Sequence, residues 1–377
     1  MPIYRHTGWG RVENQNLSGS HELTQFNTAS RSDLLIRVTF VLLPRFNMMT
    51  LTGLVEPLRI SNYLSPTPQF HWCFVSPDPG AATASNGMIQ VCEPLSDAAQ
   101  ESEIIFVLGS WGSEHYVNQS LINWLRHGRR RGAALCAVEL GCYILARAGL
   151  LKDRRATTHW SWAAGFQEQF PDVELEEQLY TIDGKIMTCA GGTAGLDFML
   201  RFVAEHRGQR LAAEVADQML HHPVRPADGP QRQAFGRSSD SLTTEVRTAI
   251  RLIESHVSEP LPVPEIAARV GVSQRQLERY FKASMGCTVV QFGQLLRLQH
   301  ARVLLIATQL GIHEIAVASG FNTLSHFAHA FKKCFGRRPS EYREAWPEQD
   351  AAPSWPGTLF NFVDALREKN DMQSASP

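Results

Sequence analysis

Apolar residues in the first half of the chain come in short continuous runs, separated by stretches with helical spacing. Five runs have the length of buried strands: Leu35–Leu43, His71–Val75, Ile104–Leu108, Ala133–Val138 and Ile186–Cys189. Stretches whose apolar residues lie three or four apart follow several of them: Thr52–Tyr63, Gln119–Arg130, Leu140–Ala148 and Ala194–His206. Continuous apolar strands that alternate with helices predict a mostly parallel sheet covered by helices on both faces.

The pattern changes to helices alone after residue 240, and one arrangement occurs there twice. A short apolar helix, a turn and a second helix with a polar outer face are predicted within Leu261–Lys282, and again within Gly311–Gly336. The turns fall at Gly271 and Gly320, and Val289–Ile306 predicts one long helix between the two units. A second helix presented in this way can enter the major groove of DNA. Two units therefore predict contacts with two successive grooves.

The spacing also predicts which side chains of the second helices face outward. If Leu277, Tyr280 and Phe281 point to the core, and Phe327 and Phe331 do the same in the second unit, the opposite faces are exposed. We expect DNA contacts from these faces, at Gln274, Arg275, Glu278, Arg279, Ser325, His326 and His329. Arginine can bind guanine through two hydrogen bonds, and glutamine can bind adenine. For any single residue, an ordinary solvated position is the alternative.

Composition divides the chain into segments of different character. Residues 1–33 are polar and predict a flexible arm, residues 223–240 are rich in Pro, Gly and Ser and predict a linker, and residues 347–377 predict a mostly disordered tail. The two domains would then occupy residues 34–222 and 241–346. A short amphipathic helix is expected around Phe360–Leu366 in the tail.

Charge is distributed unevenly between these segments. From Ser241 to Ala345 the chain has 13 Lys and Arg against 8 Asp and Glu, a net charge of +5, whereas the whole chain has −1. The remainder therefore carries −6, and a basic end on an acidic body suits a DNA-binding domain attached to a sensor.

The sequence has no recognisable signal for membrane insertion, export or metal binding. No apolar run is long enough to span a bilayer, and no signal peptide begins the chain. The seven cysteines form no C-x-x-C pair, so the pattern indicates neither a zinc site nor a disulfide framework. Together with the absent export signal, the odd number of cysteines favours the reducing cytoplasm. No cofactor or metal is expected.

The helical end resembles the AraC/XylS family of transcription regulators. The resemblance covers roughly Leu242–Trp346 and is most specific in G-F-N-T-L-S-H-F-A-H-A-F-K-K-C-F-G followed by R-R-P-S-E-Y-R. It implies an all-α domain of seven helices whose two recognition helices enter adjacent major-groove segments. It also places Arg275, Arg279, Ser325, His326 and His329 at the family's base-reading positions.

The first domain carries a different resemblance, centred on A-A-L-C-A-V-E-L-G-C-Y-I-L-A-R-A-G-L-L (Ala133–Leu151). This run predicts a buried strand, a sharp turn and a helix, the arrangement that forms a nucleophile elbow. With R-A-T-T-H-W and T-C-A-G-G-T-A-G-L-D, it resembles the PfpI-like branch of the class I glutamine amidotransferases, a flavodoxin-like α/β fold. Active members carry cysteine at the elbow and a later histidine; here those positions are Glu139 and His159. Glutamate cannot supply the thiolate that amidase chemistry needs, so we expect no catalysis.

The elbow remains a candidate for binding a small effector. Trp111 follows a strand and Trp160 follows His159, and we expect both near the same edge of the sheet. A carboxylate with aromatic walls suits a cationic ligand such as an amine. We therefore expect Glu139, His159, Trp111 and Trp160 to form an effector site. The alternative is that Glu139 pairs with an arginine and the tryptophans fill core. Glu56 is a further candidate for this site, and it could equally pair with Arg59.

These observations predict a cytoplasmic, sequence-specific transcription regulator. The resemblance favours an activator of a catabolic operon. The carboxylate with aromatic walls favours a small nitrogenous metabolite as its effector, such as an amino acid, an amine or a quaternary ammonium compound. Expected partners are double-stranded DNA, the effector, RNA polymerase and a second copy of the chain. The competing hypothesis is an amidase or hydrolase with an accessory DNA-binding domain.

Overall fold

The first half of the chain folds around a mixed, mostly parallel sheet. The computed structural model describes residues 35–345 except 79, 97–100 and 232–241. Eight strands form the sheet in the order β3-β4-β2-β1-β5-β6-β10-β9. Their bounds are β1 Ile36–Leu42, β2 Phe70–Ser76, β3 Gly80–Thr83, β4 Ile89–Pro94, β5 Ile104–Gly109, β6 Ala134–Glu139, β9 Tyr180–Asp183 and β10 Ile186–Cys189. The pairs from β4 to β10 are parallel, and only the two outermost pairs are antiparallel.

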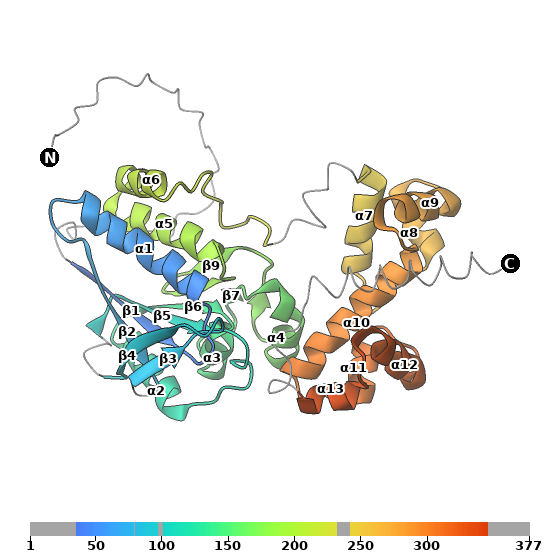
Figure 1. The fold of residues 1–377 in the computed structure, drawn as a ribbon, viewed down its shortest axis with the longest axis horizontal. Coiled ribbons are helices and arrows are strands. Elements are labelled where there is room, and N and C mark those ends of the chain that lie inside the picture. Colours follow the sequence, from blue (N-terminus) through green and yellow to red (C-terminus); the bar gives the residue numbers. More distant parts are fainter. Residues whose placement is uncertain (1–34, 79, 97–100, 232–241, 346–377) are drawn as a thin grey trace, which may run out of the picture. The chain divides into compact units, whose positions relative to one another are not determined.

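Helices cover both faces of this sheet, as its continuous apolar strands predict (Figure 1). Helices α1 (Met48–Leu64), α5 (Ala194–Arg207) and α6 (Gln209–Gln218) pack together on one face, and α2 (Gln119–Arg130) and α3 (Gly141–Arg147) lie on the other. Successive side chains of a strand point to opposite faces. In β1, Phe40 and Leu42 accordingly join the core under α1 and α5, while Val41 joins the core under α2 and α3.

Smaller elements complete the first domain. A two-stranded sheet of β7 (Arg155–Ala156) and β8 (Glu174–Leu175) flanks the short 3-10 helix η2 (Trp160–Trp162) and helix α4 (Ala163–Gln169). Residues 223–231, which the composition assigns to a linker, are hydrogen bonded to this domain through Arg225 and Gln231. The backbone between residues 155 and 162 carries His159 and Trp160, two of the predicted effector residues.

Between residues 242 and 345, which the structure describes, the second half is all helical, in agreement with the sequence. Its helices are α7 Thr244–Glu254, α8 Val263–Val270, α9 Gln274–Met285, α10 Val289–Ala307, α11 Ile312–Ala318, α12 Leu324–Phe335 and α13 Pro339–Ala345. Helix α10 begins where the long connecting helix was predicted and ends one residue later. A core of its own, built around Ile250, Leu277, Phe281 and Phe292, holds α7, α8 and α9 against the start of α10.

Part of the sequence-based picture lies outside the described residues. This applies to the predicted arm at residues 1–33, to the part of the predicted linker from residue 232 onward, and to the predicted tail with its short helix. Among the residues that are described, no helix is both long and apolar enough to cross a membrane.

Candidate functional site

The first helix-turn-helix unit consists of α8, a glycine turn and α9. Gly271 ends α8 in the left-handed conformation, with φ of 85°, which a residue without a side chain adopts readily. Ser273 then caps α9, as its sequence position predicts: its hydroxyl accepts a hydrogen bond from Gln276 N, and the Gln276 side chain accepts one from Ser273 N. Leu277 and Phe281 are fully buried, whereas Tyr280 is half-buried. The inward face of α9 is therefore close to the predicted one.

The outward face of α9 exposes three of its four predicted DNA contacts. Gln274, Arg275 and Arg279 are exposed, and the Arg279 guanidinium lies 5.3 Å from the centre of the Tyr280 ring. Glu278 is half-buried, and its Oε2 accepts a hydrogen bond of 3.3 Å from Val289 N, the first residue of α10. A carboxylate there satisfies a free N–H group of the helix start. Glu278 thus joins α9 to α10, and its carboxylate is engaged there instead of in the predicted DNA contact.

The second unit repeats this design with α11 and α12. The Thr323 hydroxyl caps α12 by accepting a hydrogen bond from His326 N, and Phe327 and Phe331 are fully buried, as predicted. Ser325, His326 and His329 are exposed. The His326 ring also reaches α10, where its Nε2 lies 3.3 Å from Nε2 of Gln294.

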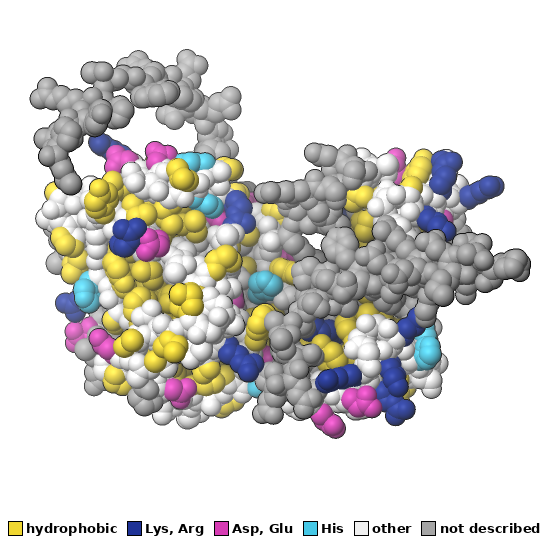
Figure 2. Space-filling model, in the orientation of Figure 1, with side chains coloured by type: hydrophobic (Ala, Val, Ile, Leu, Met, Phe, Trp, Pro, Cys, Tyr) yellow, Lys and Arg dark blue, Asp and Glu magenta, His cyan; other side chains and the backbone are white. Residues whose placement is uncertain are grey.

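Helix α10 is hydrogen bonded to the turn of the second unit. Arg297 donates from Nη1 to the carbonyl oxygen of Gly320 over 3.0 Å, and its guanidinium lies 5.0 Å from the centre of the Phe321 ring. Lys and Arg side chains gather over α9 and α12 (Figure 2). Two exposed, basic helices on a common connecting helix form a surface suited to two segments of the DNA backbone.

The elbow of the first domain is formed at the end of β6. Glu139 is the last residue of that strand and has φ of 53°, a left-handed conformation that is unusual for a side-chain-bearing residue. Its side chain is only 5% exposed. Its Oε1 accepts hydrogen bonds from Thr50 Oγ1 (2.7 Å), Asn47 Nδ2 (2.9 Å) and Gly192 N (3.2 Å). The predicted elbow is present, and its acid is held by α1 and by the loop before α5.

The electrostatic state of Glu139 reflects two opposing effects. Burial raises the pKa of the carboxyl group, because a low-dielectric site penalises the charged form, while hydrogen bonds from Thr50, Gly192, Asn47 and Ser110 act in the other direction. Packing is also tight, since a Cβ built on Gly191 would lie 1.9 Å from Cγ of Glu139. The carboxyl group is therefore enclosed by the protein's own groups, and no arginine pairs with it among the contacts of the described residues.

Thiol chemistry has no suitable residue near this elbow. Cys136, Cys142 and Cys189 are fully buried, and burial raises the pKa of each thiol, that of Cys189 to about 12. The Cys142 thiol donates to the carbonyl oxygen of Thr157. A nucleophilic cysteine needs an exposed thiolate, so these three residues do not replace the cysteine that Glu139 displaces.

The segment that carries His159 and Trp160 adjoins the elbow. Thr158 donates from its hydroxyl to the carbonyl oxygen of Glu139 over 2.9 Å. His159 caps η2: its Nδ1 accepts a hydrogen bond from Ser161 N and lies 2.7 Å from Ser161 Oγ. Burial lowers the pKa of His159 to about 4, so its ring is neutral at physiological pH. The rings of His159 and Trp160 are 5.6 Å apart and both are half-buried.

The remaining two predicted effector residues differ in their surroundings. Trp111 is half-buried and follows β5, whose last residue, Gly109, is in register with Glu139. Glu56 forms an ion pair with Arg59 on the same helix, with 2.6 Å between Oε2 and Nη2. This is the pairing that its sequence position offers as the alternative to a role at the elbow.

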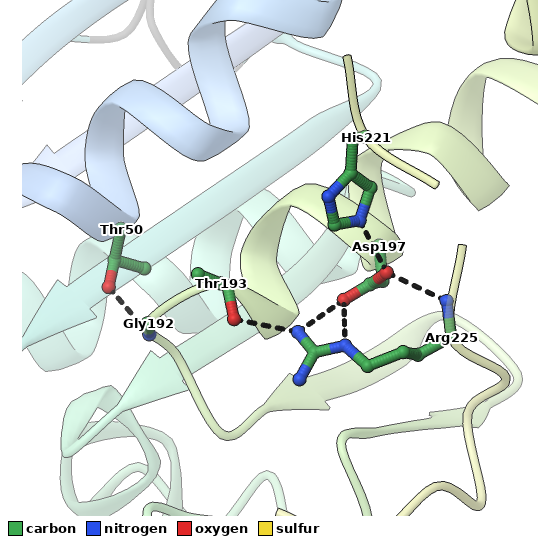
Figure 3. Close-up of polar contacts among 6 residues, drawn as sticks. All are labelled: Thr50, Gly192, Thr193, Asp197, His221 and Arg225. Atoms are coloured by element: carbon green, nitrogen blue, oxygen red, sulfur yellow. Dashed lines mark hydrogen bonds and ion pairs between the residues drawn. The ribbon is translucent and has the colours of Figure 1, made fainter. Parts of the chain in front are cut away.

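Several polar residues around the elbow were not predicted from the sequence. They are Asn47, Thr50, Ser110, Thr158, Asp197, His221, Arg225 and Gln231. Asp197 is fully buried on α5 and receives hydrogen bonds from His221 and Arg225 (Figure 3). The only sequence signal for Asp197 was an acid in the first turn of a helix, which is a common position for a surface residue.

Comparison with known proteins agrees with both halves of this description. Residues 266–345 match a helix-turn-helix domain family and residues 37–205 match the DJ-1/PfpI family. The HTH-type transcriptional regulator CdhR of Pseudomonas aeruginosa is 35% identical over 318 residues, which cover 84% of this chain and 94% of that protein. The chain belongs to this family of AraC-type transcriptional regulators.

Other members of the family match over a similar length. The HTH-type transcriptional regulator GbdR of Pseudomonas aeruginosa is 32% identical and covers 82% of this chain and 84% of its own. The regulator GlxA of Rhizobium meliloti is 32% identical and covers 81% of this chain and 95% of its own. The resemblances to the AraC family and to PfpI-like proteins are thereby confirmed, and the protein is a transcriptional regulator with an AraC-type helix-turn-helix domain and a DJ-1/PfpI-like domain.

Proposed function

We propose that this AraC-type regulator reads a specific DNA sequence through α9 and α12 and responds to a small nitrogenous metabolite through its first domain. The observation that carries the proposal is the pair of exposed, basic recognition helices joined by α10, with α10 bonded to the second turn through Arg297. Activation of a catabolic operon, contact with RNA polymerase, a homodimeric state and a place in the cytoplasm with the DNA belong to the same proposal.

The effector site is proposed at the edge of the sheet around the elbow. Trp111, His159 and Trp160 are half-buried there, so aromatic faces can contact a cationic group. Glu139 itself is enclosed by hydrogen bonds from Asn47, Thr50 and Gly192. These contacts favour an indirect role, in which the carboxyl group organises the loops that meet the effector. The amidase alternative is disfavoured because the elbow has no accessible thiol.

The DNA-reading role is tested by two substitutions on α9. Selection from a random duplex pool with the full-length protein should first enrich a sequence. On that sequence, Arg275→Ala or Arg279→Ala is expected to cost about 1–3 kcal/mol of binding free energy and to relax base preference locally. Affinity for random-sequence duplex should change much less, and fluorescence anisotropy can measure both.

Arg269 provides a matched control for these substitutions. It is exposed in the same unit, but it lies on α8 and pairs with Glu265 over 2.6 Å. Arg269→Ala is expected to keep the base preference. Equal losses on selected and random duplex would make Arg275 and Arg279 phosphate contacts, and a pool that enriches no sequence would overturn the proposed function.

A further inference from the structure

The chain leaves the first domain through residues 221–231, which we call the exit segment. Its first half is fastened to the buried carboxylate of Asp197 on α5 (Figure 3). His221 Nε2 donates to Oδ1 over 2.8 Å, and Arg225 donates to the same carboxylate from its backbone N (2.8 Å) and from Nε (2.9 Å). Arg225 Nη2 also reaches Thr193 Oγ1 at 2.7 Å. A buried carboxylate with this set of donors is a strong anchor.

The second half of the exit segment is fastened at two points. The carbonyl oxygen of Ala227 accepts a hydrogen bond from Leu179 N over 2.9 Å, and the carboxamide of Gln231 holds the end nearer the linker. Oε1 of Gln231 accepts a hydrogen bond from Trp160 N over 2.8 Å. Its Nε2 donates to Thr157 Oγ1 (2.9 Å), to the carbonyl oxygen of Thr158 (2.9 Å) and to the carbonyl oxygen of Gln178 (2.8 Å). Gln231 is the last described residue before the segment that leads to the DNA-binding domain.

The attachments of the exit segment at Asp197 and at Gln231 are both connected to Glu139 through neighbouring residues. Thr158, whose carbonyl oxygen binds Gln231, donates through its hydroxyl to the carbonyl oxygen of Glu139. Gly192, which donates to the Glu139 carboxyl group and to Thr50 Oγ1, directly precedes Thr193, the partner of Arg225. A short chain of hydrogen bonds therefore joins the elbow to each end of the exit segment.

The hydrogen-bond groups around Gln231 suit a different ligand better than an amide. The amide nitrogen has two hydrogens but faces three acceptors, whereas a primary ammonium has three N–H donors. The remaining group, Trp160 N–H, requires an acceptor, which a carboxylate oxygen supplies. An ammonium next to a carboxylate, as in a free α-amino acid, matches all four groups. A quaternary ammonium has no N–H and matches none of the three acceptors.

We propose that Thr157, Thr158, Trp160 and Gln178 form an amino-acid-binding site that the Gln231 side chain occupies as an internal ligand. A free α-amino acid competes with Gln231, and release of Gln231 detaches residues 228–231, while Leu179 N still holds the carbonyl oxygen of Ala227. This inference rests on the proposed function, because it names the effector class and the step by which the effector reaches the DNA-binding domain.

The linker supplies the readout, since Arg232 follows Gln231 directly in the sequence and Arg237 lies five residues further on. The full-length protein is treated with trypsin, and cleavage after these two arginines is timed by mass spectrometry. The standard α-amino acids are added one at a time at millimolar concentration. At least one should accelerate linker cleavage several-fold, and trimethylglycine should not. Trypsin activity on a small amide substrate is recorded in the same solutions.

Substitutions of Gln231 test whether its side chain acts as the internal ligand. Gln231→Ala and Gln231→Glu should each accelerate linker cleavage about tenfold without added amino acid, a factor that corresponds to the loss of one or two net hydrogen bonds. Neither should respond further to the active amino acid. Gln218→Glu repeats the chemical change at an exposed position of α6 and should behave as wild type. Circular dichroism checks that each variant is folded.

Failure of this inference is distinguishable from failure of the proposed function. The inference is overturned if no α-amino acid changes linker cleavage in the wild type, or if both Gln231 variants are cleaved and respond like the wild type. Affinity for the selected duplex is measured in parallel. If the wild type does not bind the selected duplex specifically, the proposed function is wrong instead. The cleavage experiment then still tests the proposed amino-acid-binding site.

Discussion

Glu139 combines an unusual backbone with an enclosed side chain. A carboxyl group that accepts hydrogen bonds from α1 and from the loop before α5 fixes the spacing between those elements at the edge of the sheet. The same residue accepts a hydrogen bond on its carbonyl oxygen from Thr158. Its role at the residue scale is thus to connect three segments that are distant in sequence.

Substitution of Glu139 should reveal this role through stability. Glu139→Gln keeps the oxygen that accepts from Thr50, Asn47 and Gly192, whereas Glu139→Ala leaves buried donors without an acceptor and should cost roughly 3 kcal/mol of unfolding free energy. Urea unfolding at neutral pH measures both. If Glu139→Ala lost as little unfolding free energy as Glu139→Gln, the proposed role of Glu139 in connecting these segments would be wrong.

The pH dependence of stability, compared between the wild type and Glu139→Gln, tests the buried state of the Glu139 carboxyl group independently. Because burial raises the pKa of Glu139 above 4.5, the folded wild type binds the proton more tightly than the unfolded chain does. Its stability should therefore fall, relative to Glu139→Gln, as pH rises from below 4.5 through the raised pKa. Glu174→Gln, at an exposed position of β8, controls for the general loss of a carboxyl group.

At the scale of elements, the two helix-turn-helix units differ in how tightly their turns are packed. Gly271 has φ of 85° and Gly320 has φ of 72°, so both turns use the left-handed region. A Cβ at Gly271 would meet no atom within 4 Å, whereas a Cβ at Gly320 would lie 2.5 Å from the carbonyl oxygen of Val257 and 2.9 Å from Cγ of Pro260. The second turn is therefore packed against the segment between α7 and α8.

This difference predicts unequal effects of the same substitution. Gly271→Ala should cost about 1 kcal/mol of unfolding free energy, from the backbone conformation alone. Gly320→Ala should cost about 3 kcal/mol, because the Val257 backbone must also move, and DNA affinity should fall with it. Urea unfolding and duplex binding of both variants measure these effects. Equal losses of unfolding free energy would show that the contact of Gly320 with Val257 and Pro260 does not contribute to stability.

Elements whose sequence pattern follows from burial were predicted well. Strands β1, β5 and β6 are mostly apolar because helices cover both faces of the sheet, and α10 is long enough to show its helical period. The hairpin of β3 and β4 was not predicted, since it lies at the edge of the sheet and exposes Ile89 and Val91. Short edge strands with exposed side chains lack the periodic signal that a buried face imposes.

The elbow was predicted because strand, turn and helix are adjacent in sequence, but its partners were not. Asn47, Thr50 and Gln231 come from distant segments, and each is a polar residue that the sequence gives no reason to place inside. Glu278 shows the same limit, because helical spacing predicts its direction but not the nearby N–H group of Val289. Burial of polar residues depends on tertiary partners, which one-dimensional periodicity does not contain.

At the scale of the whole molecule, basic and acidic residues are distributed unequally between the helical domain and the rest of the chain. The helical domain carries +5 and the rest of the chain −6, so attraction to the DNA backbone is concentrated on the domain with the recognition helices. The first helix-turn-helix unit of that domain also has a separate core, which includes Ile250, Leu277 and Phe292. DNA binding and effector response should therefore be separable along the chain.

A fragment of residues 240–346 tests this separation and the proposed homodimer together. The fragment should bind the selected duplex without any response to α-amino acids, because the proposed effector site lies in the first domain. If the first domain holds two copies together, the full chain engages two sets of phosphates, and the slope of log affinity against log salt should be about twice that of the fragment. Anisotropy titrations at several salt concentrations measure both slopes. Equal slopes would argue against a dimer formed by the first domain, and an effector response from the fragment would place sensing in the helical domain, where no part of the elbow is present.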